Sequence, residues 1–165
     1  MKSMKITKIA TRIVNLPFES TITTAIHKMS SVGCVLLTIE TDEGIEGQSY
    51  LFSLNASNIH SFDEKLKKFE RHLIGKDPHL VEVIWQEIWQ VISSVRDKHI
   101  AISALSTIDT AIWDIVGKTA NLPLHRLFGA CREKIKTYAS GGLWLSQPID
   151  SLLKDAQNFL DQGFR

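Results

Sequence analysis

The spacing of hydrophobic residues changes once along this chain, near residue 58, and this change limits the folds open to it. Before it, short runs rich in Ile, Val and Thr place apolar side chains on alternate positions, as strands with one buried face do. After it, apolar residues recur at steps of three and four, which is typical of amphipathic helices. The chain is therefore predicted to form a small antiparallel sheet first and a group of helices second.

The strands are predicted from alternation and turn signals. The segment "GCVLLTIET" puts Val35, Leu37 and Ile39 on one face, and "DEG" at 42–44 predicts a tight turn into the next strand. The first strand is expected to stop before Pro17. The predicted strands cover residues 5–15, 33–41 and 45–50, and two loops, 17–32 and 51–57, follow the first and the third.

The helices are predicted from apolar stripes and end signals. Gly75 fits the end of the first helix, Asp77 the N-cap of the second and Pro78 its first turn. A third helix over about 100–118 carries alanines that allow close approach of another element. Pro123 can open a short helix that Gly129 closes. The first stripe is Ile59, Phe62, Leu66, Phe69 and Leu73; the second is Leu80, Ile84, Ile88, Val91 and Val95; the third is Ala101, Ala104, Leu105, Ile108, Ala111, Ile112 and Ile115.

A new pattern begins near Cys131. "KIKTYAS" at 134–140 predicts a strand, "GGLWLSQP" a loop, and 149–163 an amphipathic helix whose stripe contains Leu152, Leu153, Ala156, Phe159 and Leu160. A strand, a loop and a helix make an incomplete βαβ unit. Because a lone parallel strand has no partner, the segment is expected to belong to a larger α/β domain.

Composition excludes several classes of function. Nineteen basic and 18 acidic residues give a net charge of +1, which offers no general attraction for nucleic acid or an anionic membrane. No signal peptide and no membrane-length apolar run is recognised, so a cytoplasmic protein is expected. Cys34 and Cys131 are expected to pack as small hydrophobes. Lys65, Lys67 and Lys68 fit a solvated helix face.

Motifs for common active sites are missing as well. "GGLW" lacks the glycine spacing and the Lys-Ser/Thr of a phosphate-binding loop. The six histidines are scattered without metal-ligand spacing, so no metal site built from this chain alone is expected. No nucleophile elbow appears.

Asp109 and Asp114 lie on the predicted third helix among Ile and Ala residues. A carboxylate there could act as a general base. It could equally bond to a neighbouring backbone or pair with a basic side chain and serve as scaffold. Spacing favours the scaffold, because no second titratable group of matched role is close in sequence.

Residues Asp109–Gly129 spell D-x-A-x-W-D-x-x-G-K-x-x-x-x-P-L-x-x-L-x-G, followed later by "YASGG" and "DQGFR". This pattern resembles the first signature of the mandelate racemase/muconate lactonizing branch of the enolase superfamily. The front half resembles the mandelate racemase subgroup through Val14-Asn15, Pro17, Thr24-Ala25 and "SYLF" at 49–52. The stretch "YASGGLWLSQPID" is closer to acid-sugar dehydratases of the same subgroup.

The resemblance implies an α+β capping domain over residues 1–130, with a three-stranded antiparallel sheet and a helical bundle. The start of a modified TIM (β/α) barrel would follow at 131–165. Family members hold Mg²⁺ with acidic residues of later barrel strands and remove the proton α to a carboxylate. Their bases are a K-x-K lysine, which follows "GFR", and usually a His–Asp pair. Asp109 and Asp114 match scaffold positions. No catalytic base and no metal ligand is therefore expected within this chain, and alone it is expected to be inactive.

The same resemblance assigns substrate specificity to two loops that close over the barrel, here 18–32 and 51–57. Leu54 stands where mandelate racemases carry tyrosine, and His27 replaces a glycine, so mandelate itself is not the expected substrate. Ser140 matches a serine that helps hold the substrate carboxylate at the end of the first barrel strand. The expected substrate-binding residues are Ile22, Thr24, His27, Met29, Leu54, Ser140 and Trp144, with solvent exposure as the alternative for those in the loops.

The expected function is the N-terminal part of a Mg²⁺-dependent racemase or dehydratase (an isomerase or lyase) acting on a small hydroxy or sugar acid. A cycloisomerase or epimerase of the same branch, and a non-catalytic truncated remnant, are the alternatives. The apolar stripe at 152–160 would need cover. A homo-oligomer or a complementary barrel fragment is therefore the expected protein partner.

Overall fold

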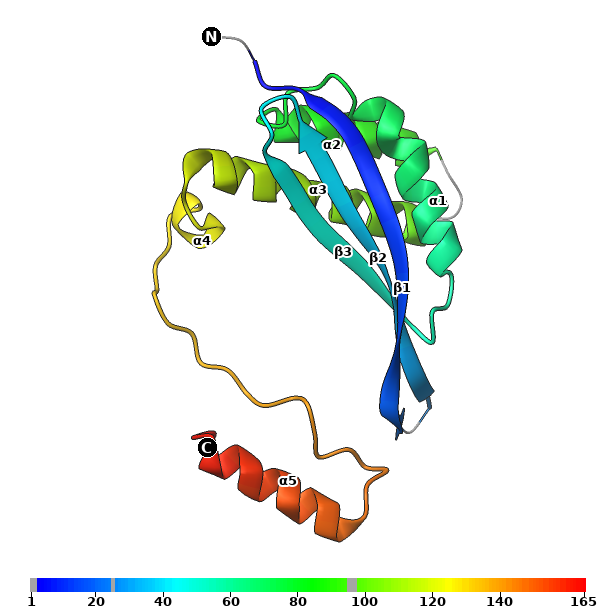
Figure 1. Ribbon diagram of the computed structural model, residues 1–165, viewed down its shortest axis with the longest axis vertical. Helices are drawn as coiled ribbons and strands as arrows, with labels where there is room; N and C mark the ends of the chain where they lie inside the picture. The colour runs from blue at the N-terminus through cyan, green and yellow to red at the C-terminus, as the bar shows by residue number, and fades with distance from the viewer. Residues whose placement is uncertain (1–2, 25, 95–97) are drawn as a thin grey trace.

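A three-stranded antiparallel sheet carries helices on one face, as the predicted fold class requires (Figure 1). The computed structural model describes residues 3–24, 26–94 and 98–165. The strands run in the order β1–β2–β3 and comprise β1 (Ile6–Thr23), β2 (Lys28–Thr41) and β3 (Glu46–Leu54). Val35, Leu37 and Ile39 lie on the helix side of β2, each at most 1% exposed, as their alternation predicts.

All three strands are longer than predicted, since β2 also begins at Lys28 and not at 33. The expected end before Pro17 is wrong, since β1 continues through Pro17, which pairs with Ser31. Proline is tolerated because β1 is an edge strand, where an absent N–H breaks no inner ladder. An irregularity between Pro17 and Ile22 then leads into the tip, and β1 and β2 form a long two-stranded ribbon. Much of the predicted loop 17–32 is this ribbon. β3 likewise continues to Leu54, and the turn after it covers only 55–58.

The helices follow the predicted stripes closely. They are α1 (Ile59–Phe69), the short 3₁₀ helix η1 (Glu70–His72), α2 (Val81–Ser93), α3 (Lys98–Ala120), α4 (Leu124–Leu127) and α5 (Ile149–Asp161). All five predicted residues of the first stripe and all seven of the third are buried. Val95, predicted to continue the second stripe, and Ala25 of the predicted first loop lie outside the described residues.

The second helix differs from the prediction at its start. Leu80, expected in the stripe, is 53% exposed and is the N-cap of α2. Asp77 instead closes a turn, where its carboxylate accepts the N–H of His79 at 2.9 Å. The buried line of α2 is Ile84, Ile88 and Ile92, so the helix is rotated slightly from the expected face.

The close approach predicted for α3 occurs at β3. A Cβ built on Gly47 would lie 2.0 Å from the carbonyl oxygen of Ala111, so only glycine fits between strand and helix. Among the described residues, α3 alone has the length and apolar composition of a membrane span. Its apolar side chains pack instead on the sheet and on α1 and α2, as those of a core helix do.

Residues 131–165 contain a helix but no strand. α5 forms as predicted, whereas 134–140, expected as a strand, is irregular chain. A parallel strand depends on hydrogen bonds from neighbouring strands, and the described chain pairs none with this segment. No side chain of 131–165 is buried. In Figure 1 this part runs away from the helices after α4 and comes back to the sheet at the tip of the β1–β2 ribbon. The domain boundary at residue 130 stays a prediction.

Candidate functional site

The tip of the β1–β2 ribbon carries the four candidates from the first loop. Ile22 pairs with Met29 across the ribbon, and both side chains are half-buried. Thr24 N–H donates to the carbonyl of His27 at 2.8 Å, and His27 N–H donates to Thr24 Oγ1 at 3.0 Å. The Thr24 hydroxyl therefore holds the turn, whereas the His27 side chain is exposed to solvent.

Leu54 ends β3 and pairs with Val32, at the point where the ribbon leaves the sheet. It is 42% exposed and belongs to the outward-facing positions of β3 with Tyr50 and Phe52, opposite the helices. Leu54 thus lies near the base of the ribbon, on one continuous piece of sheet with the tip residues.

Asn55 joins these two regions, and sequence reasoning missed it. Its side-chain amide donates to Lys28 O at 2.9 Å, and its Oδ1 accepts the N–H of Ser30 at 2.9 Å. Its backbone is left-handed, with φ of 53°. An asparagine directly after a predicted strand was a usable signal, since Asn tolerates this conformation and bonds to nearby backbone.

Ser140 and Trp144 lie in the irregular chain before α5. Trp144 N–H donates to Gln147 Oε1 at 2.7 Å, and Gln147 Nε2 donates to Asp155 at 2.9 Å, which forms a turn against α5. Thr23 N–H reaches Ser146 Oγ at 3.4 Å, so this turn lies beside the ribbon tip. Ser140 is exposed, and its expected place at a strand end is wrong for this chain because the strand is not formed.

Asp114 has a structural role, as the scaffold interpretation expects. Its Oδ2 accepts the N–H of Gln48 at 2.9 Å and the ammonium of Lys118 at 2.7 Å. Lys118 also donates to Glu46 O at 2.7 Å. The pair therefore occupies backbone groups along the outer edge of β3, groups that a further strand would otherwise bind.

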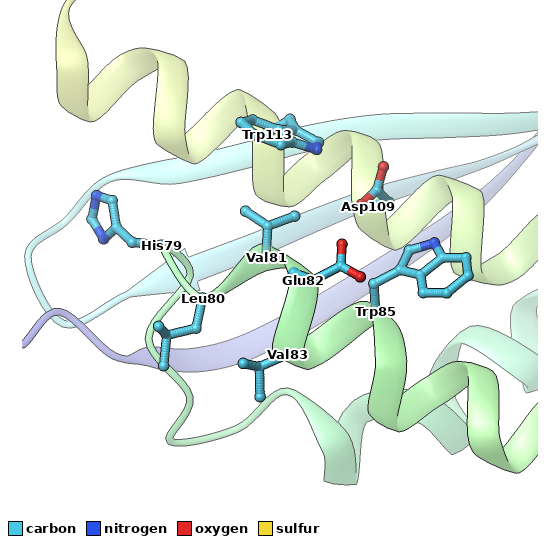
Figure 2. A pocket seen from close by; sticks show the side chains of 8 residues that line it. All are labelled: His79, Leu80, Val81, Glu82, Val83, Trp85, Asp109 and Trp113. Carbon is cyan, nitrogen blue, oxygen red and sulfur yellow. The ribbon is translucent and has the colours of Figure 1, made fainter.

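Asp109 lies in a cleft of about 610 Å³ between α2 and α3 (Figure 2). Burial, and secondarily the nearby Glu82 carboxylate, raises the pKa of Asp109. Within the described part of the chain this carboxylate has no hydrogen bond or ion pair. The cleft is lined by His79, Leu80, Val81, Glu82, Val83, Trp85, Asp109 and Trp113.

Among the side chains that line the cleft, the Glu82 carboxylate interacts with Asp109 and, after burial, helps to raise its pKa. Figure 2 shows His79 and Asp109 at opposite ends of the cleft. The His79 ring is bonded to Asp77, with 2.9 Å between Nδ1 and Oδ1. The cleft therefore brings two carboxylates together, while its histidine lies away from Asp109 and is already bonded to Asp77.

Magnesium does not fit the residues present. Over residues 3–24, 26–94 and 98–165, no three His, Cys, Asp or Glu side chains gather in a way that could hold a metal ion. The carboxylates with shifted pKa values, Asp63, Asp77 and Asp109, belong to separate environments. No step involving a metal is assigned to these residues.

Comparison with known proteins gives a consistent family. Residues 6–129 match the family described as "Mandelate racemase / muconate lactonizing enzyme, N-terminal domain". The chain is 30% identical to 3,6-anhydro-alpha-L-galactonate cycloisomerase of Streptomyces coelicolor over 97% of its length, and 31% identical to L-talarate/galactarate dehydratase of Salmonella typhimurium over 77%. It covers 44% and 32% of those two proteins, so it spans less than half the length of each.

Solved structures agree with the sequence comparison. The crystal structure of L-talarate/galactarate dehydratase from Salmonella typhimurium LT2 has a TM-score of 0.88 and 27% identity, covering 98% of this chain and 42% of that one. A racemase from Streptomyces coelicolor A3(2) with bound magnesium has a TM-score of 0.89 and 30% identity, covering 97% and 45%. The similarity extends through the ribbon, the helices and residues 131–165.

Proposed function

The chain belongs to the mandelate racemase/muconate lactonizing enzyme family of the enolase superfamily, and we propose from this membership that it is the substrate-covering part of an enzyme acting on sugar acids. The enzyme would remove the proton α to a carboxylate and then eliminate water. One observation carries this proposal: the chain is similar over almost its whole length to L-talarate/galactarate dehydratase, including the ribbon and the turn after β3.

Within this function the chain would supply specificity and leave the chemistry to other residues. The exposed His27 and Ser146 give the ribbon tip polar groups, while Ile22 and Met29 at the tip and Leu54 near the base of the ribbon add apolar ones. Such a mixed surface suits an acid with hydroxyl groups along its chain better than an aromatic acid. Magnesium, which the S. coelicolor racemase structure contains, would be held by residues outside 1–165.

A cycloisomerase is the second candidate, because the relative aligned over 97% of this chain is one by name. Both reactions begin by removing an α-proton and differ in what leaves or attacks next. The substrate-covering role of the ribbon tip is the same in both.

The experiment uses the full-length protein that contains this chain, with Mg²⁺, on a panel of sugar acids in D₂O. We expect deuterium to enter α to the carboxylate of at least one sugar acid, with mandelate clearly slower. NMR of the product separates dehydration from cycloisomerisation. The 165-residue chain by itself is expected to exchange no α-proton, and exchange by that chain would refute the assignment of the chemistry to other residues.

We also propose that residues 131–165 bind a second copy of the chain or a complementary barrel fragment. Leu153 and Leu160 on α5 are 65% and 48% exposed, and covering an apolar side chain of this size stabilises by about 1.5–3 kcal/mol. Light scattering at micromolar concentration should show association. A monodisperse 18.6 kDa species with α5 protected from hydrogen exchange would contradict this.

A further inference from the structure

The overhang of β2 beyond β3 leaves backbone groups that need partners. β3 ends at Leu54, opposite Val32, while β2 begins at Lys28. On one side of the overhang, Lys28 and Met29 pair with Thr23 and Ile22 of β1. On the other side no residue of β3 remains to continue the ladder. An unpaired strand segment of this kind would twist freely and fray.

The side chain of Asn55 fills the place of the missing strand. The Asn55 backbone N–H donates to Ser31 O at 2.9 Å, which prolongs the β3 ladder by one bond. Its side-chain amide then accepts from Ser30 N–H and donates to Lys28 O, both at 2.9 Å. One amide thus acts as donor and acceptor, as a peptide group would. Among side chains of this length only asparagine offers both groups in this arrangement.

The turn that carries Asn55 is held in an unfavourable backbone conformation. Asn55 and Ala56 have φ of 53° and Asn58 has φ of 57°, a left-handed region that asparagine tolerates and that is unfavourable for Ala56. Close packing keeps the turn against the ribbon: a Cβ on Gly33 would lie 2.6 Å from Ala56 Cβ. Strain of this kind persists where the surroundings over-determine it and is concentrated at functional segments.

We propose that Asn55 is a positioning residue that fixes the ribbon tip relative to Leu54, and that this spacing sets which sugar acid the enzyme accepts. The inference rests on the proposed function. The candidates Ile22, His27 and Met29 lie on the overhang or its turn, while Leu54 precedes Asn55 directly. Loss of the Asn55 amide would leave each of these side chains in place but let the ribbon move against the sheet.

The structural part is tested in the 165-residue chain by amide hydrogen exchange at Ser30. Asn55→Gly keeps the left-handed turn and removes the amide. Losing a hydrogen bond of about 1 kcal/mol should speed Ser30 exchange about five- to tenfold. Asn58→Gly is the matched control, since Asn58 has the same backbone conformation and caps α1 without a side-chain hydrogen bond. Unchanged exchange in Asn55→Gly, or equal acceleration in the control, would refute the inference that the Asn55 side chain holds the β2 overhang.

The functional part is tested in the full-length enzyme by steady-state kinetics on the sugar-acid panel. Asn55→Gly should raise KM about tenfold, change kcat less than twofold and alter the order of preferred substrates. The reason is that the variant weakens binding of the substrate and of the transition state equally, while the residues that carry out the chemistry are unchanged. Asn55→Asp keeps the acceptor for Ser30 and loses the donor to Lys28, so its KM should lie between those of the wild type and Asn55→Gly. If Ser30 exchange is faster but KM is unchanged, the role of Asn55 in substrate choice is refuted, while the proposed function of the enzyme is not. Wild-type enzyme with no turnover of any sugar acid would overturn the proposed function together with that role.

Discussion

The two ends of this chain are built on different principles. Among the described residues, those up to 130 bury a core of 22 hydrophobic side chains from the sheet and helices, whereas 131–165 bury none. Yet α5 in the second part is as regular as α1 in the first. A helix satisfies its backbone internally, so an amphipathic sequence can form one before it is covered. A strand depends on neighbours, and the predicted strand at 134–140 does not form without them.

The largest expected effect separates the two regions by a core deletion. Leu66→Ala, at a site 0% exposed on α1, should lower the free energy of unfolding by about 2–5 kcal/mol, because it leaves a cavity. Leu153→Ala on α5, a site 65% exposed, should change it by less than about 0.5 kcal/mol. Urea denaturation followed by circular dichroism measures both. Equal effects would mean that α5 is part of the same cooperative core.

A methyl group added at a glycine should also affect the two regions differently. Gly47→Ala forces a Cβ to within 2.0 Å of Ala111 O and should destabilise by about 1–3 kcal/mol as α3 is pushed from the sheet. Gly141→Ala is the control, since no heavy atom lies within 4 Å of its Cβ position, and the midpoint of unfolding should stay near that of the wild type. A tolerated Gly47→Ala would show that helix and strand separate easily.

A smaller effect, on both stability and association, is expected at the outer edge of β3. Asp114→Ala removes the acceptor for Gln48 N–H and the partner of Lys118, at a cost of about 1 kcal/mol. It also opens the edge to pairing, so size-exclusion chromatography should show more association. Asp161→Ala on α5, which loses only an exposed hydrogen bond from Gln157, should show neither change. Association rising equally in both variants would point to α5 and away from the edge.

The smallest expected effects are on the pH dependence of the free energy of unfolding, and they have opposite signs at two aspartates. Burial tends to raise the pKa of Asp63, but hydrogen bonds from Lys67 and Thr11 outweigh it and hold the pKa below its usual range. Asp63 therefore stabilises the fold above the unfolded pKa of about 3.9, and this contribution is lost as the pH falls through the folded value. Asp63→Asn should be less stable than wild type at pH 7, with the difference shrinking in acid.

Asp109 should behave in the opposite way. Its pKa is raised by burial and by Glu82, so the charged form opposes folding above the folded pKa, and this cost disappears below the unfolded pKa of about 3.9. Asp109→Asn should be slightly more stable than wild type at pH 7, and the gain should vanish near pH 3. Denaturation curves at pH 3, 5 and 7 measure both variants. Two variants that respond to pH alike would refute the separate environments assigned to these carboxylates.

The sequence predicted the features that depend on local pattern. The stripe from Ile59 to Leu73 and the alternation of Val35, Leu37 and Ile39 gave the correct buried faces, because burial follows from the period of the element. The stop at Pro17 was wrong, because whether proline is tolerated depends on strand order, which no local pattern contains.

The candidate site was predictable in outline. The resemblance pointed to the ribbon tip and the turn after β3, and the assignment of both to substrate binding stays a prediction. Asn55 was missed because its role depends on the overhang between β2 and β3, a difference in strand length that appears only once the register is known. Asp114 was correctly expected to be scaffold, but its partner Gln48, 66 positions away in sequence, came from the fold.

The order of the elements along the chain also bears on how the protein folds as it is made. Within the part of the chain that the structure describes, the buried core lies between Met4 and Ile115, so its side chains exist before α4 and α5 are translated. At about 5–20 residues per second, the ribosome takes roughly 2 to 9 seconds to synthesise residues 121–165. Small domains fold in microseconds to seconds. The sheet and its helices can thus form during translation, before α5 is complete.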